Sequence, residues 1–490
     1  MNDNVFSVTI DDTNPEPIVQ EYCKKLSEAS KSVLFLLVIY PFEEYWLPGN
    51  KSPTPSTARP RDLVATDETI TFPVKPSTEL AALYCLSLSG GQCSVKVAVS
   101  DDAPVFRKAL QAQKGTLGED AFVSMCGALG LPYFTNDRLF EFEPISIPKP
   151  WGKEIWYTGI EERGVASFTA QGFTSPIPWV LSTLPSAFCG NSQRELILLK
   201  ILDPYPDPAF GDLYFELHQK KREVYVVTAI DPVAWPSGIG AIRFGFDQAK
   251  RKEYGSDASF RESFMAAVSN YEAIRRKIDD YTDNLRLRDG IPENQLVDNA
   301  ISNAWLSEVP DSWKSEELMF ARTVETFTDK LSLSVGDVVK VPCLTPHSLQ
   351  HGVRTIEFQT PVYERLIVSF NQKVQTQSGW DTNKAIEVMN LESVPQSEIP
   401  HLVEELGVKQ EKIVEFEDFD VIRIEIEAGA QFILSDIDNY CLIIGISGII
   451  HINAESLEPE RASLLTRDMS GAKIVPILHD SACFLIAYPK

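Results

Sequence analysis

Two stretches of sequence decide the fold: Gly211-Asp-Leu-Tyr-Phe-Glu-Leu-His-Gln-Lys-Lys-Arg-Glu-Val-Tyr-Val-Val227 and Gly336-Asp-Val-Val-Lys-Val-Pro-Cys-Leu-Thr-Pro-His-Ser-Leu-Gln-His-Gly352. Each joins a glycine, the apolar residues of a β-strand and side chains that bind metal ions. In the first stretch, Glu216 and His218 are two residues apart, so a strand directs both to the same face. Four residues then leave room for a turn, and Glu223 begins the next apolar strand. Interpreted as a β-hairpin, this stretch brings three candidate ligands together.

The second stretch supplies a fourth ligand. Its alternating valines predict a strand that stops at Pro342, and we expect His347 at the start of the following strand. Two imidazoles and two carboxylates fit a divalent transition ion such as Zn, Mn, Fe or Ni, with positions left open for water or substrate. Two alternatives remain: His351 replaces His347 if the strand begins earlier, and the Cys343 thiolate lies near enough in sequence to touch the ion.

These stretches resemble the two motifs of the cupin superfamily. The second matches the pattern G-x5-P-x-G-x2-H, with Leu344 at the usual glycine. The first resembles a family pattern of Gln-x-His followed by Lys-x-Glu, with a shorter insertion and with Glu216 at the glutamine. The wider context is similar to type I mannose-6-phosphate isomerases, over roughly residues 145 to 490. The further matches are Pro150-Trp151-Gly152, Leu199-Lys200-Ile201-Leu202-Asp203, Ile356-Glu357-Phe358-Gln359-Thr360-Pro361 and Tyr363-Glu364-Arg365.

The resemblance implies a metal-dependent aldose–ketose isomerase acting on a sugar phosphate, of the type that interconverts mannose 6-phosphate and fructose 6-phosphate. It implies one divalent ion, zinc in the first place and manganese or iron as alternatives. The implied metal ligands are Glu216, His218, Glu223 and His347.

Lys221 and Arg365 are the implied catalytic residues. Lys221 matches a family lysine and lies two residues before Glu223, so we expect it at the reacting end of the substrate. Arg365 matches a family arginine that faces the sugar phosphate, and it would neutralise charge on the substrate or on the enediolate. Two alternatives follow if the family match is set aside. Lys221 is then also typical of a solvated lysine in a Lys-Lys-Arg turn. Arg365 is then also typical of a structural salt bridge.

Glu216 is the departure that most weakens the transfer of this activity. Two carboxylates and two neutral imidazoles cancel the charge of a divalent ion, and such an ion polarises a carbonyl less strongly. Two other classes therefore stay open. One is another metal-cupin enzyme, an oxygenase or an epimerase, and the other is a non-catalytic regulatory protein that binds sugar phosphates.

The composition excludes some partners. The 490 residues carry a formal charge of -24, which argues against nucleic acid as a partner. No apolar run approaches the ~18 residues that span a bilayer, and the start lacks the features of a signal peptide, so we expect no membrane partner and a cytoplasmic protein. The eight cysteines form no C-x-x-C pair, which suits a reducing compartment. The oligomeric state is left open.

An anionic substrate would need a local basic patch in this acidic chain. The candidate residues for that patch are Lys149, Lys153, Lys200, Lys221, Arg222 and Arg365.

The chain is expected to be mainly β, with cupin jelly-roll barrels. We divide it into an N-terminal α/β region of unknown role (residues 1–145), a metal-binding cupin domain (146–392) with a helical insertion at about 250–330, and a second jelly roll (393–490). In the N-terminal region we expect a helix from Pro17 to Ser30 and strands at 33–40, 80–88 and 93–99. Residues 53–61 are expected to form a loop, and Gly90-Gly91 a turn.

Overall fold

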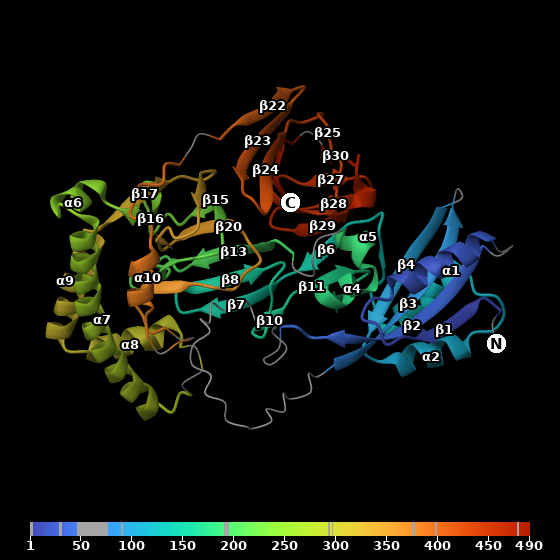
Figure 1. Cartoon of the computed structure of the whole chain (residues 1–490), viewed down its shortest axis with the longest axis horizontal. Coiled ribbons are helices and arrows are strands. Elements are labelled where there is room, and N and C mark those ends of the chain that lie inside the picture. The colour runs from blue at the N-terminus through green and yellow to red at the C-terminus, as the bar shows by residue number, and fades with distance from the viewer. Residues whose placement is uncertain are drawn as a thin grey trace, which may run out of the picture.

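The computed structural model describes residues 3–28, 32–46, 77–89, 92–190, 196–292, 295, 297–374, 377, 379–396, 399–477 and 480–490. The expected loop at 53–61 and the Gly90-Gly91 turn lie outside these residues. Figure 1 shows an N-terminal α/β unit on one side, a central β unit with a helical bundle on the other side, and the C-terminal strands above the centre.

The N-terminal unit is a five-stranded sheet with helices on both faces. Alternate side chains of its second strand face opposite ways: Leu36 packs with Val19 of the first helix, and Phe35 packs with Phe106 and Phe122 of the two later helices. The strands lie in the order β1 (Val5–Thr9), β2 (Val33–Glu43), β3 (Ser77–Ser89), β4 (Gln92–Ser100) and β5 (Phe134–Thr135), and the helices are α1 (Glu16–Glu28), α2 (Ala103–Ala112) and α3 (Glu119–Leu129).

The central unit contains two sheets whose apolar side chains meet in one cluster, including Tyr225, Val227, Ile242 and Leu349. The six-stranded sheet has the order β18 (Val338–Val341), β15 (Glu223–Ile230), β20 (Val353–Gln359), β13 (Leu198–Pro204), β8 (Gly152–Trp156) and β7 (Ile145–Lys149). The five-stranded sheet has the order β17 (Thr328–Leu333), β16 (Gly240–Phe246), β19 (His347–Leu349), β14 (Phe215–Leu217) and β21 (Leu366–Ser369).

A helical insertion separates β16 from β17 (Figure 1). Its longest helix buries Phe260, Phe264 and Val268 at the three- and four-residue steps of an amphipathic helix, and they pack against the outer side of β14 and β21 through Phe215 and Leu366. The helices are α6 (Gln248–Glu253), α7 (Asp257–Arg288), α8 (Asn299–Glu308) and α9 (Asp311–Glu325), and α10 (Thr382–Val388) follows β21.

The C-terminal strands form a four-stranded sheet and, together with three strands from residues 140–176, a nine-stranded sheet, and the two sheets enclose a second apolar cluster. The larger sheet has the order β12 (Phe173–Pro176), β11 (Ser167–Ala170), β6 (Phe140–Glu143), β29 (Ala462–Thr466), β26 (Tyr440–Ser447), β31 (Ala482–Pro489), β24 (Phe419–Ile426), β23 (Val408–Glu415) and β22 (His401–Glu405). The smaller one has the order β25 (Phe432–Ile433), β30 (Lys473–Pro476), β27 (Ile450–Ile452) and β28 (Glu455–Leu457). A 3₁₀ turn, η1 (Arg467–Met469), follows β29.

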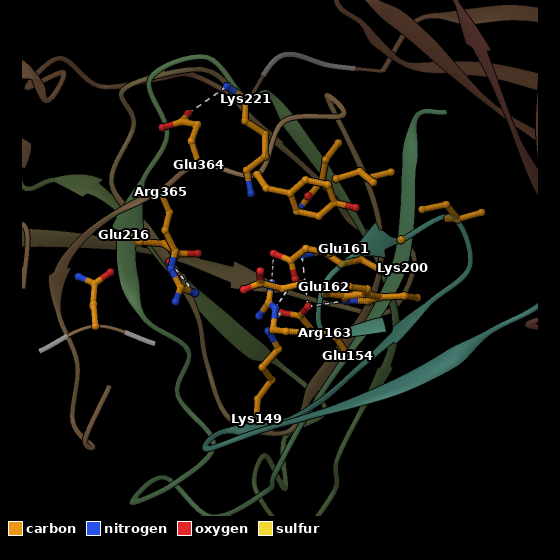
Figure 2. Close-up of a pocket in the computed structure, with 17 residues that line it drawn as sticks. Lys149, Glu154, Glu161, Glu162, Arg163, Lys200, Glu216, Lys221, Glu364 and Arg365 are labelled. Atoms are coloured by element: carbon orange, nitrogen blue, oxygen red, sulfur yellow. Dashed lines mark hydrogen bonds and ion pairs between the residues drawn. The ribbon is translucent and has the colours of Figure 1, made fainter. Parts of the chain in front are cut away.

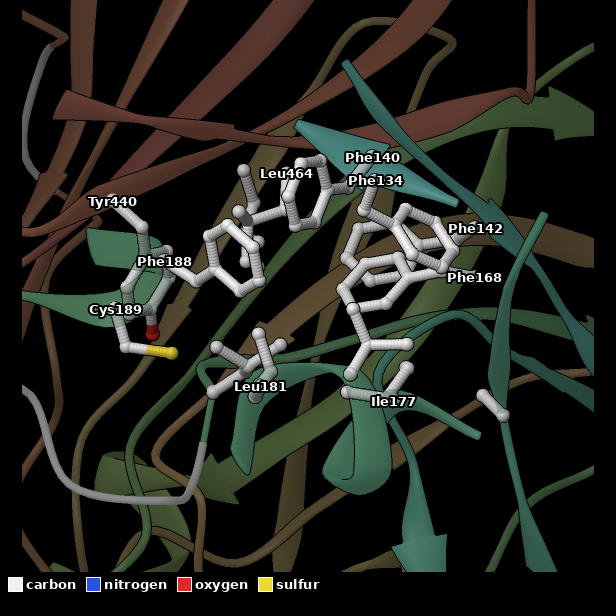
Figure 3. Close-up of a cluster of buried hydrophobic side chains, with 14 of the residues drawn as sticks. Phe134, Phe140, Phe142, Phe168, Ile177, Leu181, Phe188, Cys189, Tyr440 and Leu464 are labelled. Atoms are coloured by element: carbon white, nitrogen blue, oxygen red, sulfur yellow. The ribbon is translucent and has the colours of Figure 1, made fainter. Parts of the chain in front are cut away.

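An aromatic core links these units (Figure 3). Phe134 of β5, Phe140 of β6 and Phe168 of β11 lie with ring centroids 5.3 to 6.0 Å apart. Phe188 packs against Phe140 from the short helix α5 (Pro185–Cys189), which follows α4 (Ile177–Thr183). Because β6 also pairs with β29, a segment near residue 140 joins the sheet of the last hundred residues.

The expectation of a mainly β fold is confirmed, and the assignment of the sheets to cupin jelly rolls stays a prediction. Among the residues that the structure describes, no helix is long and apolar enough to cross a membrane.

Candidate metal centre and cavity

Three of the four expected ligands converge between the central sheets. His218 follows β14, Glu223 begins β15 and His347 begins β19. One ligand atom from each lies within 4.8 Å of the other two, and all three side chains are buried. The start of β19 at His347 follows the expectation, because Pro342 ends the preceding strand region and a short loop leads into the next.

The expectation that a β-hairpin joins Glu216 and His218 to Glu223 is wrong. β14 pairs with β19 and β21, whereas β15 pairs with β18 and β20 of the other sheet. The turn between His218 and Glu223 therefore crosses from one sheet to the facing sheet. Hydrogen bonds to neighbouring loops fix its position. The His218 carbonyl accepts from the Leu344 N–H at 2.6 Å, and the Glu364 carboxylate accepts from the N–H groups of Gln219 and Lys220. The alternation of side chains along a strand shows which residues share a face, but it does not show which strand is the neighbour. The sequence pattern is therefore compatible with a hairpin in one sheet and with a crossing to the facing sheet.

The hydrogen bonds of the imidazoles suit metal ligation. Nδ1 of His218 lies 2.8 Å from the carbonyl oxygen of Glu364, and Nδ1 of His347 lies 2.9 Å from that of Thr345. A carbonyl only accepts, so each Nδ1 carries a hydrogen, and a neutral ring then keeps an Nε2 lone pair for the centre. Burial opposes the charged form of His347, but its hydrogen bond to Glu223 outweighs burial and raises the pKa of His347. Burial lowers the pKa of His218, which favours this neutral ring. The buried Nε2 of His218 lies 3.1 Å from Oε1 of Glu223, so it faces the centre.

The Glu223 carboxylate lies within hydrogen-bond distance of side chains from several elements. The Lys221 ammonium lies 2.8 Å from its Oε1, and Gln359 donates to the same oxygen at 2.9 Å. Tyr225 donates to Oε2 at 2.6 Å, and Nε2 of His347 lies 3.0 Å from that oxygen. Burial opposes ionisation, but His218, Lys221 and His347 outweigh it and hold the pKa of Glu223 well below its usual range. The site therefore presents an ionised carboxylate and two imidazoles, a donor set that fits a divalent ion.

Glu216 lies at the cavity side of the other three residues. Its Oε1 is 3.9 Å from Nε2 of His218, but Glu216 is not among the three residues whose ligand atoms all lie within 4.8 Å of one another. Its Oε2 is buried without a hydrogen-bond partner and lies 3.8 Å from Nη1 of Arg365. Glu216 is thus placed either to complete an ion's ligand set or to face a substrate, while Arg365 balances its charge.

The two alternative ligands lie elsewhere. His351 pairs with Asp212 at 2.7 Å and stacks on Trp235 at a centroid distance of 4.8 Å. Cys343 directs its thiol to the Lys221 carbonyl at 3.7 Å. Neither belongs to the ligand group found among the described residues.

A cavity of about 420 Å³ opens beside the candidate metal centre (Figure 2). Of the six residues expected to form a basic patch, Lys153 instead pairs with Asp203 at 3.2 Å, and Arg222 pairs with Glu417 at 2.5 Å. The other four line the cavity, together with the predicted ligand Glu216. One further cation and four carboxylates, which sequence reasoning did not assign to the site, also line it. The charged lining residues are Lys149, Lys200, Lys221, Arg365, Arg163, Glu154, Glu161, Glu162, Glu216 and Glu364.

A buried polar row crosses the six-stranded sheet from the cavity to Glu223. The order of the row is Lys149, Glu154, Lys200, Glu357, Gln359 and Glu223. Lys149 lies 3.3 Å from Glu154, and Lys200 lies 3.8 Å from Glu154 and 3.2 Å from Glu357. Burial raises the pKa of Glu357 to about 8, whereas Lys200 and Lys149 outweigh burial at Glu154 and hold its pKa far below its usual range. Opposite charges therefore alternate from Lys149 through Glu154 to Lys200, and the neutral Gln359 separates Glu357 from Glu223.

Comparisons with known proteins support the fold. The solved mannose 6-phosphate isomerase from Bacillus subtilis is 12% identical, with a TM-score of 0.50 over 71% of this chain and 99% of that one. A zinc-bound mannose 6-phosphate isomerase (12% identity, TM-score 0.47) and a mutant phosphomannose isomerase from Salmonella typhimurium (12%, TM-score 0.48) each cover 72% of this chain and 99% of their own. No family model matches the chain, and no curated protein matches it. This chain therefore shares the fold of the Bacillus subtilis enzyme, and the similarity extends no further than the fold.

Proposed function

We propose that this protein is a metal-dependent aldose–ketose isomerase that acts on a sugar phosphate, of the mannose 6-phosphate to fructose 6-phosphate type. The observation that carries the proposal is the convergence of His218, Glu223 and His347 next to a charged cavity. The fold shared with a mannose 6-phosphate isomerase supports the same reaction class.

The ion would be held by His218, Glu223 and His347, with Glu216 as the fourth ligand. Zinc is our first choice because it accepts nitrogen and carboxylate ligands at one site, and manganese or iron are the alternatives. When bound, a divalent ion supplies a Lewis acid that polarises the oxygens of the opened sugar.

Lys221 and Arg365 are the residues that we assign to the reaction. Lys221 points its ammonium at the metal centre, where it would donate to the substrate oxygen and exchange a proton with it. The guanidinium of Arg365 lies over the Tyr214 ring, 4.5 Å from its centroid, and its Nη1 lies beside Glu216. That position suits charge that develops on an enediolate. The isomerisation moves hydrogen within one molecule, so it needs no external oxidant or reductant.

The test is an assay for the interconversion of mannose 6-phosphate and fructose 6-phosphate. Metal-stripped protein is resupplied separately with Zn, Mn, Fe and Co. We expect turnover with at least one of these ions and its loss in His218→Ala. His451→Ala is the matched control, because His451 lies in the C-terminal sheets and bonds to Ser456.

Absence of turnover with every ion, in protein that binds one ion per chain, would contradict the isomerase assignment. In that case the site would belong to another metal-dependent reaction or to a sugar-phosphate sensor.

A further inference from the structure

Arg365 lies at the metal end of the cavity. Its Nη1 is 3.8 Å from Glu216, and its guanidinium rests on Tyr214. Figure 2 shows Arg365 and Glu216 together on one side of the cavity, away from Lys149. An arginine in this position would contact the substrate near its reacting carbons. The opposite end of the substrate would then bind to other residues.

The candidates for those partners lie beside Trp156. Nζ of Lys149 lies 5.8 Å from the Trp156 ring and Cζ of Arg163 lies 5.2 Å from it. The ring is only 4% exposed, and its N–H donates to the buried Glu154 at 2.6 Å. Trp156 is therefore a fixed platform with two cations close to its ring, and both cations line the cavity.

The register of the sheet gives the separation of the two ends. Tyr225, two residues after Glu223, is in register with Glu357, then with Lys200 and then with Trp156 across β15, β20, β13 and β8. Three interstrand steps amount to about 14 Å between Cα atoms. Long side chains reach inward from both ends, so an opened six-carbon sugar phosphate has the length to join them.

The electrostatics at this end favour an anion. Lys149 is 9% exposed and has Glu154 as its carboxylate partner, while Arg163, Lys200 and Arg365 add positive charge around it. Burial, followed by these cations, lowers the pKa of Lys149 to about 8. Arg163 directs its guanidinium at Glu161 with an Nη2–Oε1 distance of 2.8 Å, and a phosphate offers a similar pair of oxygens.

We propose that Lys149 and Arg163 bind the phosphate of the substrate beside Trp156, and that the phosphate displaces Glu161 from Arg163. This assignment rests on the proposed function and adds to it: the metal centre and Arg365 meet the carbonyl end, and Lys149 and Arg163 select a phosphorylated substrate. Glu161 then acts as an internal competitor that the phosphate must replace.

The test measures binding to the metal-loaded full chain by calorimetry. The probes are a hexitol 6-phosphate, which has no carbonyl to isomerise, and the same hexitol without phosphate. We expect Arg163→Gln and Lys149→Met each to weaken binding of the phosphorylated probe by about 10- to 100-fold, the range of a charge-assisted hydrogen bond. Glu161→Gln should tighten it several-fold.

The matched control is Lys153→Met, because Lys153 lies on the adjacent strand and pairs with Asp203 outside the cavity lining. It should change the affinity less than about twofold. Arg163 has a side chain that is 36% exposed, so Arg163→Gln keeps the test valid even if Lys149→Met fails to fold.

Three results would overturn the assignment. The first is wild-type affinity in Arg163→Gln, the second is a loss confined to Arg365→Gln, and the third is no binding of the phosphorylated probe to the wild type. Failure of the proposed function is distinguishable, because it would appear as no turnover of mannose 6-phosphate by the wild-type protein.

Discussion

The central and C-terminal units both enclose apolar clusters between facing sheets, yet their interiors differ. The C-terminal cluster consists of apolar side chains such as Ile424, Ile443 and Phe484. The central unit has a comparable apolar cluster, but it also buries His218 and Glu223 with their neighbours at one end. Similar layers thus support either a mainly apolar interior or one with charged groups at one end.

The charged interior is tolerated because its groups have partners. Buried charges are costly unless they are paired and hydrogen-bonded, and along the polar row from Lys149 to Glu223 each charged group has an oppositely charged or hydrogen-bonding neighbour. The C-terminal unit has its own buried carboxylate, Glu411, but Arg423 and Lys409 pair with it at 2.6 and 2.9 Å on the sheet. The difference between the units lies in the converging imidazoles, and the following predictions test it.

The largest effect is expected at the metal centre. Glu223→Gln keeps the shape of the side chain and removes its charge, so metal affinity should fall by more than about 100-fold, the upper range for residues that only orient ligands. Glu411→Gln, in the C-terminal sheets, should leave metal affinity unchanged. Titration of metal-stripped protein measures both affinities. Equal losses in the two variants would mean that the effect is one of folding.

The next effect concerns stability without metal binding. Phe484 is fully buried in the C-terminal cluster, and Phe484→Ala should lower the free energy of unfolding by about 3 to 5 kcal/mol. The folded variant should still bind one ion per chain with wild-type affinity. Denaturant unfolding and metal titration check the two parts. A loss of metal binding in the folded variant would show that the units are coupled.

A smaller effect depends on pH. The pKa of Lys149 is about 8 in the folded protein and about 10.5 when unfolded, so between these values the unfolded chain binds more protons. Unfolding free energy should therefore rise with pH from 8 to 10.5, by roughly 3 kcal/mol from this group. Denaturant unfolding of wild type and Lys149→Met across this range isolates the contribution. Lys153→Met is the control, and its curve should parallel the wild type.

The smallest effect is expected at Leu344. Its φ of 66° lies in the left-handed region, where glycine is unstrained. We expect Leu344→Gly to be more stable than Leu344→Ala by about 1 kcal/mol, because both remove the side-chain contacts but only glycine relieves the backbone. Thermal unfolding of the pair measures this. The opposite order would mean that the turn relaxes without strain.

Much of the fold was accessible from sequence because its signals are local. The start of β19 at His347, the helical insertion and the apolar strands follow from turn residues and periodicity. The motif glycine replaced by Leu344 still marks a left-handed turn. The pairing of β14 and β15 was not accessible, because alternation leaves open whether a turn joins neighbours in one sheet or crosses to the facing sheet.

The cavity was predictable only in part. Lys200 and Arg365 belong to quoted motifs and line it, but Lys153 and Arg222 have carboxylate partners elsewhere. Arg163 belongs to a short hairpin of β9 (Ile160–Glu161) and β10 (Gly164–Val165) with no motif of its own. The proposed role of Arg163 depends on how that hairpin packs against Trp156. This packing is a tertiary contact, which the local sequence pattern does not predict.

The most direct test of the central claim is a crystal structure of zinc-soaked protein with anomalous data at the zinc edge. We predict one strong peak per chain, about 2.0 to 2.2 Å from Nε2 of His218, Nε2 of His347 and a Glu223 oxygen. The same map shows whether Glu216 is the fourth ligand. Absence of a peak among these three residues, with zinc bound elsewhere or not at all, would contradict the account.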